Sequence, residues 1–390
     1  MSPADYALLI VDDNPNNRFT LARRLTREGY TNVTQAENGR QALDLIKAKP
    51  FDLVLLDIMM PDINGYEVLE QLKKDPKLRD IPVIMISAID EVESVVRCIE
   101  IGAEDYLPKP FNVTLLRARV GATLEKKRMR DEITRHTRRM ERELATARAI
   151  QLSMVPTDFP TAAPERPITL YAVLRPAREI GGDLYDFFWV APDCICLVVA
   201  DVSDKGAPAA LYMARAKTVI RVVATHLADA CGGAFSPAEL VSKANSVLCQ
   251  DNPHMMFVTL FLCLLNVRSG ELTWCNAGHN APYLFSREGV LAALGTEDIP
   301  AGLVPTFTYS SKSAQFSDGG SLFIFSDGIT EAMNEQSELY GSEQLEATIR
   351  SHADSAPSDL VAAVLQKLQS FTGTAAQSDD ITVLACRWGT

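Results

Sequence analysis

The first 110 residues alternate between short, continuous apolar runs and longer segments whose apolar positions recur with helical spacing. The apolar runs are Tyr6–Val11, Leu53–Leu56 and Ile81–Ile86. The helical segments are Asn16–Glu28, Arg40–Lys47, Tyr66–Lys74 and Glu91–Ile101. Strands that are apolar throughout need both faces covered, as in a parallel sheet with helices on each side. The pattern therefore predicts an α/β domain with a doubly wound, five-stranded parallel sheet, whose ligands bind at the carboxyl ends of the strands.

Polar residues follow these predicted strands at the edge where ligands bind. Asp12 and Asp13 follow the first strand, and Asp57, Ser87 and Lys109 follow the third, fourth and fifth. Carboxylate oxygens are preferred ligands of Mg2+, so three acids and one cation at this edge predict a magnesium site. A phosphoryl group on Asp57 could be held by the metal, the Ser87 hydroxyl and Lys109. A single Asp-Asp pair would more often be a turn or a helix cap.

This stretch resembles the receiver domain of bacterial response regulators, over about residues 4–125. The matching motifs are Asp57-x-x-x-Pro61-x-x-x-Gly65, Ser87-Ala88, Lys109-Pro110 and the aromatic residue Tyr106. The resemblance implies that a sensor histidine kinase is the phosphoryl donor and Asp57 the acceptor. It implies that Mg2+ is bound by Asp12, Asp13, Asp57 and the Met59 carbonyl. It also implies that Lys109 contacts the phosphoryl group, while Ser87 and Tyr106 relay the change to the fourth and fifth helices.

The segment from Asn112 to Val155 contains no proline and a single glycine, Gly121, and is rich in helix formers. The last receiver helix is therefore predicted to continue as one long helical linker. A heptad seam is formed by Ile133, Met140, Ala147 and Met154, with Leu144, Thr137 and Gln151 at the d positions. This seam predicts a marginal parallel coiled coil, and hence a homodimer. Its phase slips near Lys126, as expected of a signalling helix whose pairing can change. There are two alternatives to a coiled coil: a single solvated helix, or a helix whose basic face binds nucleic acid.

Four prolines, at Pro156, Pro160, Pro164 and Pro167, separate this helix from a strand-rich C-terminal part. Strands are predicted at Ile168–Leu174, Tyr185–Val190, Ile195–Ala200, Phe257–Leu265, Leu272–Asn276, Tyr283–Phe285, Ser321–Ser326 and Ile381–Arg387. Helices are predicted at Ala207–Ala224, Pro237–Leu248, Glu343–His352 and Ser358–Phe371. The pattern predicts an α+β sandwich with helices covering the sheets. The predicted domains are thus a receiver at 1–121, a linker at 122–155 and a third domain at 156–390.

Four short acidic motifs in this part are each expected to place a carboxylate directly after an apolar strand. They are Gly181-Gly182-Asp183, Asp201-Val202-Ser203-Asp204-Lys205-Gly206, Ser326-Asp327-Gly328 and Ser378-Asp379-Asp380. Unpaired carboxylates gathered at one place need cations between them. Because no histidine or cysteine accompanies them, Mg2+ or Mn2+ is favoured over zinc. Two such cations can generate hydroxide and neutralise a phosphoryl group, so hydrolysis of a phosphate ester is predicted.

The chain here resembles the metal-dependent serine/threonine phosphatases related to protein phosphatase 2C, in their bacterial sporulation protein E-like branch. The resemblance covers about residues 145–388 and also includes Ala147-Arg148-x-Ile150-Gln151, Asn276-Ala277-Gly278-His279-Asn280 and Asp380-Ile381-Thr382. It implies that two metals are bridged by Asp201, with the Val202 carbonyl on one of them. It implies that the site is completed by Asp183, Asp327 and Asp379, with Asp380 as the second choice to Asp379.

Several positions leave the chemistry open. Asp204 replaces the glycine usual in this motif, and Ser203 stands where the wider fold has a histidine, so the general acid is unassigned. His279 is a candidate, although a structural histidine that stabilises a turn is the favoured interpretation. Arg175 and Arg178 either bind substrate phosphate or form a surface pair.

Charge and composition narrow the setting. The net charge is −12, and residues 117–142 carry ten Lys or Arg and four acids, a local +6 that leaves −18 elsewhere. This balance argues against bulk nucleic-acid binding. No apolar run reaches the length of a membrane span and the N-terminus has no signal-like core, so a cytoplasmic protein is predicted. Among the eight cysteines, Cys194 and Cys196 are expected on one strand face as reduced core residues.

Together these features predict a two-component regulator whose output is dephosphorylation of phosphoserine or phosphothreonine, on an anti-anti-sigma-type protein by the resemblance. Two rivals are weighed. Gly181-Gly182-Asp183-Leu184-Tyr185 superficially resembles a diguanylate cyclase loop, but its acidic-aromatic ending is missing. The other is a non-catalytic module, with a degenerate phosphatase domain, whose partner binding the receiver controls.

Overall fold

The computed structural model describes residues 2–87, 92–161, 167–231, 234–289, 291–295 and 298–389. The chain divides into two units, Met1–Met140 and Glu141–Thr390. Ala88, Glu91 and Pro164, which took part in the motifs and boundaries expected above, lie outside the described residues.

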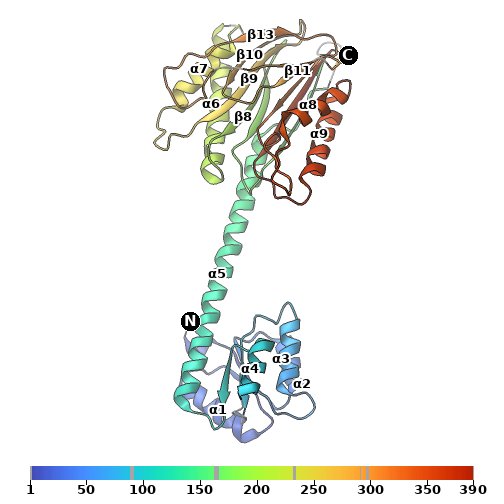
Figure 1. Ribbon diagram of the computed structural model, residues 1–390. Coiled ribbons are helices and arrows are strands. Elements are labelled where there is room, and N and C mark those ends of the chain that lie inside the picture. The colour runs from blue at the N-terminus through green and yellow to red at the C-terminus, as the bar shows by residue number, and fades with distance from the viewer. Residues whose placement is uncertain are drawn as a thin grey trace. The chain divides into compact units, whose positions relative to one another are not determined.

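The first unit, coloured blue to teal in Figure 1, is built on a parallel sheet. The sheet has five strands in the order β2-β1-β3-β4-β5. Its strands are β1 (Leu8–Val11), β2 (Val33–Ala36), β3 (Leu53–Asp57), β4 (Val83–Ser87) and β5 (Asp105–Pro108). Its helices are η1 (Pro3–Asp5), α1 (Pro15–Arg27), α2 (Gly39–Ala48), α3 (Gly65–Lys74), α4 (Val92–Ile101) and the first part of α5 (Val113–Met154). The doubly wound prediction is confirmed, and β1, β3 and β4 are buried along their whole length because helices cover both faces.

Two cores fill the space between this sheet and its helices. Helices α1 and α5 cover one face, where Leu21, Leu25, Leu116 and Val120 pack against the sheet. Helices α2, α3 and α4 cover the other face. The carboxyl ends of β1, β3, β4 and β5 therefore meet at one edge, as a parallel sheet requires.

The second unit contains two antiparallel sheets, with strand orders β13-β10-β9-β8-β7 and β12-β11-β14-β15-β6. The first sheet holds β7 (Leu184–Ala191), β8 (Cys194–Val202), β9 (Val258–Asn266), β10 (Glu271–Ala277) and β13 (Lys312–Gln315). The second holds β6 (Ile168–Arg175), β11 (Tyr283–Phe285), β12 (Leu291–Ala293), β14 (Ser321–Phe325) and β15 (Ile381–Trp388). The helices are α6 (Ala207–Cys231), α7 (Pro237–Leu248), α8 (Gly341–Ser351) and α9 (Pro357–Thr372).

The two sheets pack face to face and each carries a helix pair on its outer face (Figure 1). Phe261, Leu197 and Leu384 belong to the core between the sheets. Helices α6 and α7 pack on the first sheet, and α8 and α9 on the second. This four-layer arrangement confirms the α+β sandwich, in which every apolar face is covered.

The structure adds two strands that the apolar pattern does not predict. β12 and β13 lie at the edges of their sheets and are largely exposed. A short edge strand buries little, so its residues carry no clear alternation of apolar and polar positions. The remaining elements of this unit begin and end within a few residues of their predicted bounds, apart from α6, which continues to Cys231.

All eight cysteines are free. Cys194 and Cys196 face the same core, as their spacing predicted. No helix of the described residues combines the length and the apolar character that crossing a membrane requires.

Candidate metal centre and receiver site

The receiver unit gathers three carboxylates at the carboxyl edge of its sheet. Asp12 and Asp13 follow β1, and Asp57 ends β3. One oxygen of each lies within 4.8 Å of those of the other two, with Asp12 and Asp57 buried and Asp13 exposed. Hard oxygen ligands so grouped fit Mg2+.

Lys109 connects two of these acids. Its Nζ donates to Asp12 Oδ2 and to Asp57 Oδ2, each at 2.8 Å. Burial raises the pKa of the Asp57 carboxyl, and the Lys109 ammonium offsets this only in part. Burial also opposes the charge of Lys109, but its bonds to Asp12 and Asp57 raise its pKa overall. The single positive charge of Lys109 thus faces three carboxylates, which leaves net negative charge for a metal cation to balance.

The other expected receiver residues lie around this cluster. Ser87 is fully buried at the end of β4, and Tyr106 is buried in β5. The Met59 side chain is exposed, and its backbone hydrogen-bonds the Asp57 carboxylate. Gly65 packs so closely on the Asp57 carbonyl that a Cβ there would collide with it. The spacing from Asp57 to Gly65 is therefore a packing requirement of this turn.

In the second unit, the candidate acids come from both sheets. Asp201 lies near the end of β8 and Asp327 follows β14, whereas Asp183 precedes β7 and Asp379 precedes β15. The expectation that every acid follows its strand was wrong for the last two. Because β7 and β15 run antiparallel to β8 and β14, the start of one strand lies beside the end of its neighbour.

Electrostatic interactions link these acids to one another. Both Asp183 oxygens are buried without a hydrogen-bond partner among the described residues. Burial and the neighbouring Asp201 raise the pKa of Asp183 well above its usual value, and the nearby Thr382 and Ser326 side chains oppose this rise only in part. Burial, followed by the charge of Asp327, raises the pKa of Asp201 to about 7. Burial and Asp379 likewise raise the pKa of Asp327.

This arrangement fits a divalent cation, because a buried carboxylate with no partner is costly unless a cation joins it. The acids of the receiver cluster lie within 4.8 Å of one another, but among the described residues no three acids of the second unit do so. Asp379 pairs instead with Lys205 at 2.7 Å. All the donors are oxygens, which favours Mg2+ or Mn2+.

Asp380 is engaged differently from Asp379. Its Oδ1 accepts from the Ala177 N–H at 2.8 Å and its Oδ2 from the Gly182 N–H at 2.7 Å. A Cβ on Gly181 would collide with this carboxylate, and one on Gly328 would collide with the Asp380 carbonyl. The side chain therefore holds the loop that carries Asp183, while the glycines permit the close approach.

The Val202 carbonyl lies against the same loop. A Cβ on Gly182 would come within 2.9 Å of the Val202 oxygen. The carbonyl thus faces the backbone next to Asp183, where it is available as an oxygen ligand.

Gln151, near the end of α5, binds this loop from the other side. Its Nε2 donates to the Gly181 carbonyl at 2.6 Å, and its Oε1 accepts from the Gly181 N–H at 3.1 Å. The Gln151 side chain is buried. Its expected place in the heptad seam was therefore wrong, because the nitrogen and the oxygen of its side-chain amide both bond to the backbone of Gly181.

His279 has the contacts of a structural histidine. Its backbone N–H donates to Asn276 Oδ1 at 2.8 Å, and its ring Nδ1 lies 3.0 Å from Thr259 Oγ1. Burial lowers the pKa of His279 to about 4, so the ring is neutral near pH 7. A neutral, buried ring is a poor general acid.

The remaining candidates are exposed. Asp204 adopts a left-handed conformation with φ 76°, which explains why glycine is usual at this position. Its Oδ1 accepts from the Lys205 N–H at 2.8 Å. Arg175 ends β6, and Arg178 lies in the loop that follows.

One buried ionic group was missed by sequence reasoning. Asp186 on β7 binds both Lys217 and Arg221 of α6. The i, i+4 spacing of the two cations places them on one helix face and was the available signal. These ion pairs connect α6 to β7 at Asp186, which lies three residues after Asp183.

Comparisons with known proteins agree with both units. The family model "Stage II sporulation protein E (SpoIIE)" matches residues 191–389, and the model of the response regulator receiver domain matches residues 8–121. Protein IcfG of Synechocystis sp. is 28% identical over 263 residues, which are 62% of this chain and 41% of that protein. The chain therefore spans less than half the length of this curated relative.

Two solved structures resemble the second unit. The SiaA-PP2C domain of Pseudomonas aeruginosa aligns with a TM-score of 0.56 and 21% identity, covering 65% of this chain and 98% of that domain. The RsbU and RsbW domains of Rv1364c from Mycobacterium tuberculosis align with a TM-score of 0.50 and 25% identity, covering 58% of this chain and 62% of that one. The fold is thus that of the protein phosphatase 2C-like domains. Because its family model matches about half of the chain, this protein belongs to the SpoIIE family, and its N-terminal unit is a response regulator receiver domain.

Proposed function

We propose that this protein is a response regulator whose output is metal-dependent dephosphorylation of phosphoserine or phosphothreonine on another protein. The observation that supports this most is Asp183, buried beside Asp201 with both oxygens unpartnered. A buried carboxylate without a partner is strongly destabilising, so binding of a divalent cation would stabilise this site. Membership of the SpoIIE family and the phosphatase-like fold support the same reaction.

The proposed ligands are Asp183, Asp201, Asp327, Asp379 and the Val202 carbonyl, for two Mn2+ or Mg2+ ions. When bound, such ions supply a hydroxide near neutral pH and neutralise the phosphoryl oxygens. Asp183 and Asp201 have raised pKa values and would release protons on binding metal.

The surrounding residues would hold this site in place. Asp380 and Gln151 fix the Gly181–Gly182 loop from two sides. Lys205 holds Asp379. Since His279 is neutral and buried, we propose that water protonates the leaving group.

The substrate we propose is a phosphorylated anti-anti-sigma-type protein, on the basis of family membership. The test is release of phosphate from such a phosphoprotein with Mn2+, compared with the same reaction in EDTA. An equal rate in the two conditions would end the assignment. Capture of phosphoproteins from a lysate by the Asp201→Asn variant would then identify the substrate.

We propose that phosphorylation of Asp57 by a histidine kinase changes the phosphatase rate, with Mg2+ in the Asp12–Asp13–Asp57 cluster, Lys109 on the phosphoryl group, and Ser87 and Tyr106 as the relay. Beryllofluoride, which mimics the phosphoryl group, is expected to change the rate at least about fivefold, a typical coupling between two sites. The Asp57→Asn variant should show no response. An unchanged wild-type rate would refute receiver control.

We propose a homodimer through the exposed part of the α5 seam. The side chains of Ile133 and Met140 are 66% and 62% exposed, so their burial in a partner helix would favour association. The double variant Ile133→Asp, Met140→Asp is expected to sediment as a monomer at concentrations where the wild type is a dimer. Thr134→Asp, on the same helix but outside the seam, is the control. A wild type that is monomeric at every concentration would contradict the seam.

The predicted domain limits, 1–121, 122–155 and 156–390, and a cytoplasmic location belong to the same proposal. The basic surface of α5 is then a solvated or dimeric face, with no nucleic acid as partner. Limited proteolysis that cuts between 122 and 155 first would support these limits.

A further inference from the structure

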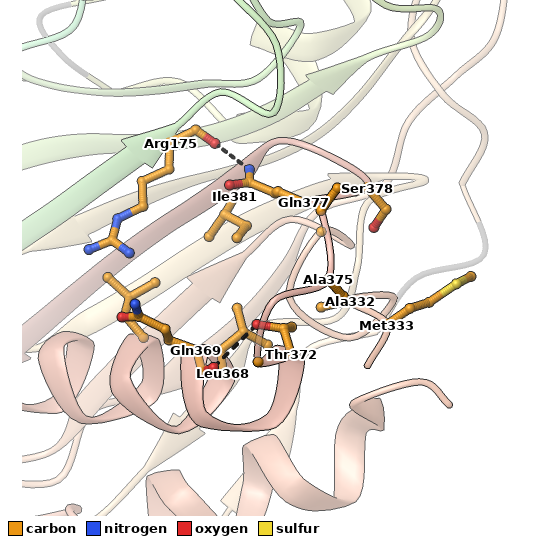
Figure 2. Close-up of a pocket in the computed structure, with 14 residues that line it drawn as sticks. Arg175, Ala332, Met333, Leu368, Gln369, Thr372, Ala375, Gln377, Ser378 and Ile381 are labelled. Carbon is orange, nitrogen blue, oxygen red and sulfur yellow. Dashed lines mark hydrogen bonds between the residues drawn. The ribbon is translucent and has the colours of Figure 1, made fainter. Parts of the chain in front are cut away.

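Figure 2 shows a groove between helix α9, the end of β6 and the loop before β15. Its volume is about 270 Å3. Two of its lining residues are Gly328, which follows Asp327, and Ser378, which precedes Asp379. One end of the groove is therefore lined by the residues next to two acids of the proposed active site.

The groove has an apolar floor and one charged wall. Leu365 and Leu368 of α9 and Ile381 of β15 are buried along the floor. Among the 14 described residues that line it, Arg175 alone is charged (Figure 2). The Gln377 side chain donates to the Arg175 carbonyl at 2.9 Å and so ties the loop before Ser378 to the end of β6.

A second hollow of about 250 Å3 adjoins the first along α9 and β6. Arg175, Leu365 and Gln369 line both hollows. The two together form a track that leads away from the metal centre, which we name the Arg175 groove. An elongated track of this kind suits an extended polypeptide better than a compact small molecule, whose pockets usually hold about 300–1000 Å3 in one cavity.

The charge of Arg175 is available to a partner. Arg175 is exposed, and no carboxylate of the described residues forms an ion pair with it. The apolar floor next to it is large enough for a bulky side chain, since a cavity of about 150 Å3 already accommodates benzene. The groove thus combines a site for an apolar side chain with a site for an acidic one.

We propose that the Arg175 groove binds the segment of the substrate protein that flanks its phosphorylated residue, taking one large apolar side chain on the floor and one acidic side chain on Arg175. This specificity role rests on the proposed phosphatase function. Binding of the flanking segment in this groove would bring the phosphorylated residue close to Asp327 and Asp379. Recognition of the substrate sequence would then depend on the groove and not on the two acids.

The test is binding of fluorescein-labelled peptides that carry a phosphonate analogue of phosphoserine, which is not hydrolysed, to the full-length protein with Mn2+, measured by anisotropy. One peptide carries Leu and Glu on both sides of the phosphoserine position, and its counterparts change Leu to Gly, Glu to Lys, or both. We expect the wild type to bind the first peptide about tenfold more tightly, from burial of leucine and a surface ion pair. Arg175→Glu should reverse the charge preference, and Ala376→Phe, which fills the groove from an exposed position, should abolish the leucine preference.

Lys367→Glu is the matched control, because it makes the same charge change on α9 but lines a different hollow. Its peptide preference and its Mn2+-dependent hydrolysis of p-nitrophenyl phosphate should equal those of the wild type. Hydrolysis of p-nitrophenyl phosphate by the wild type tests the phosphatase function separately, since this substrate has no flanking residues. The groove proposal is overturned if the wild type does not discriminate between the peptides, or if Arg175→Glu keeps the wild-type preference. It is also overturned if Arg175→Glu alters only sedimentation, which would make the groove an interface between copies.

Discussion

Replacing Asp201 with asparagine is expected to lower Mn2+-dependent phosphatase activity at least about 1000-fold. The carboxylate is proposed to bridge both cations, which contribute several kcal/mol to transition-state stabilisation, and about 1.4 kcal/mol corresponds to a factor of ten. An amide offers a weaker, neutral oxygen and cannot bridge two cations as a carboxylate does. Initial rates at saturating Mn2+ with p-nitrophenyl phosphate measure the effect.

The same substitution should not destabilise the protein in EDTA. Burial and then the charges of Asp327, Asp379 and Asp380 raise the pKa of Asp201, so a neutral replacement of Asp201 removes repulsion. A gain of about 1 kcal/mol would raise Tm by about 2–4 °C in a unit of this size. Asp229→Asn, an exposed position on α6, is the control and should change neither activity nor Tm. An active Asp201→Asn variant, or one inactive only because it unfolds, would contradict the proposed role.

Gln151→Ala is expected to lower the phosphatase rate about 10–100-fold, the usual effect of removing a group that orients a metal ligand. The variant leaves the buried N–H and C=O of Gly181 without their partner, so the loop that carries Asp183 loses one of its two supports. The apparent affinity for Mn2+ should fall together with the rate. Titration of activity with Mn2+ measures both quantities.

Ser153→Ala, two residues further along the same helix and exposed, is the control for this substitution. It should behave as the wild type. If Gln151→Ala lowered Tm but left Mn2+ affinity and rate unchanged, the contact would be structural only. This contact also suggests how α5 could act on the site, since a shift of its last turn would move the Gly181 peptide.

The receiver site could be predicted almost entirely from the sequence, because a parallel sheet brings the carboxyl ends of its strands to one edge. Asp12, Asp57 and Lys109 needed only the positions of their strands to be placed together. In the second unit the direction of each strand matters as well. Apolar runs do not show direction, so Asp183 and Asp379 were expected at the wrong ends of β7 and β15.

Contacts between distant segments account for what the sequence could not show. A heptad pattern describes the face of a helix but not its partner, and so Gln151 was assigned to a seam although it binds Gly181. Asp379 and Asp380 are adjacent and chemically equal in the sequence. Only the fold shows that Asp380 binds the N–H groups of the 177–183 loop, while Asp379 faces Lys205.

The measurement that tests the account most directly is anomalous X-ray diffraction at the manganese edge from crystals of the full-length protein grown with Mn2+. Peaks are expected in contact with Asp183, Asp201, Asp327 and Asp379, in addition to any at the Asp12–Asp13–Asp57 cluster. Manganese bound at the receiver cluster but absent from those four carboxylates would contradict the proposed phosphatase centre.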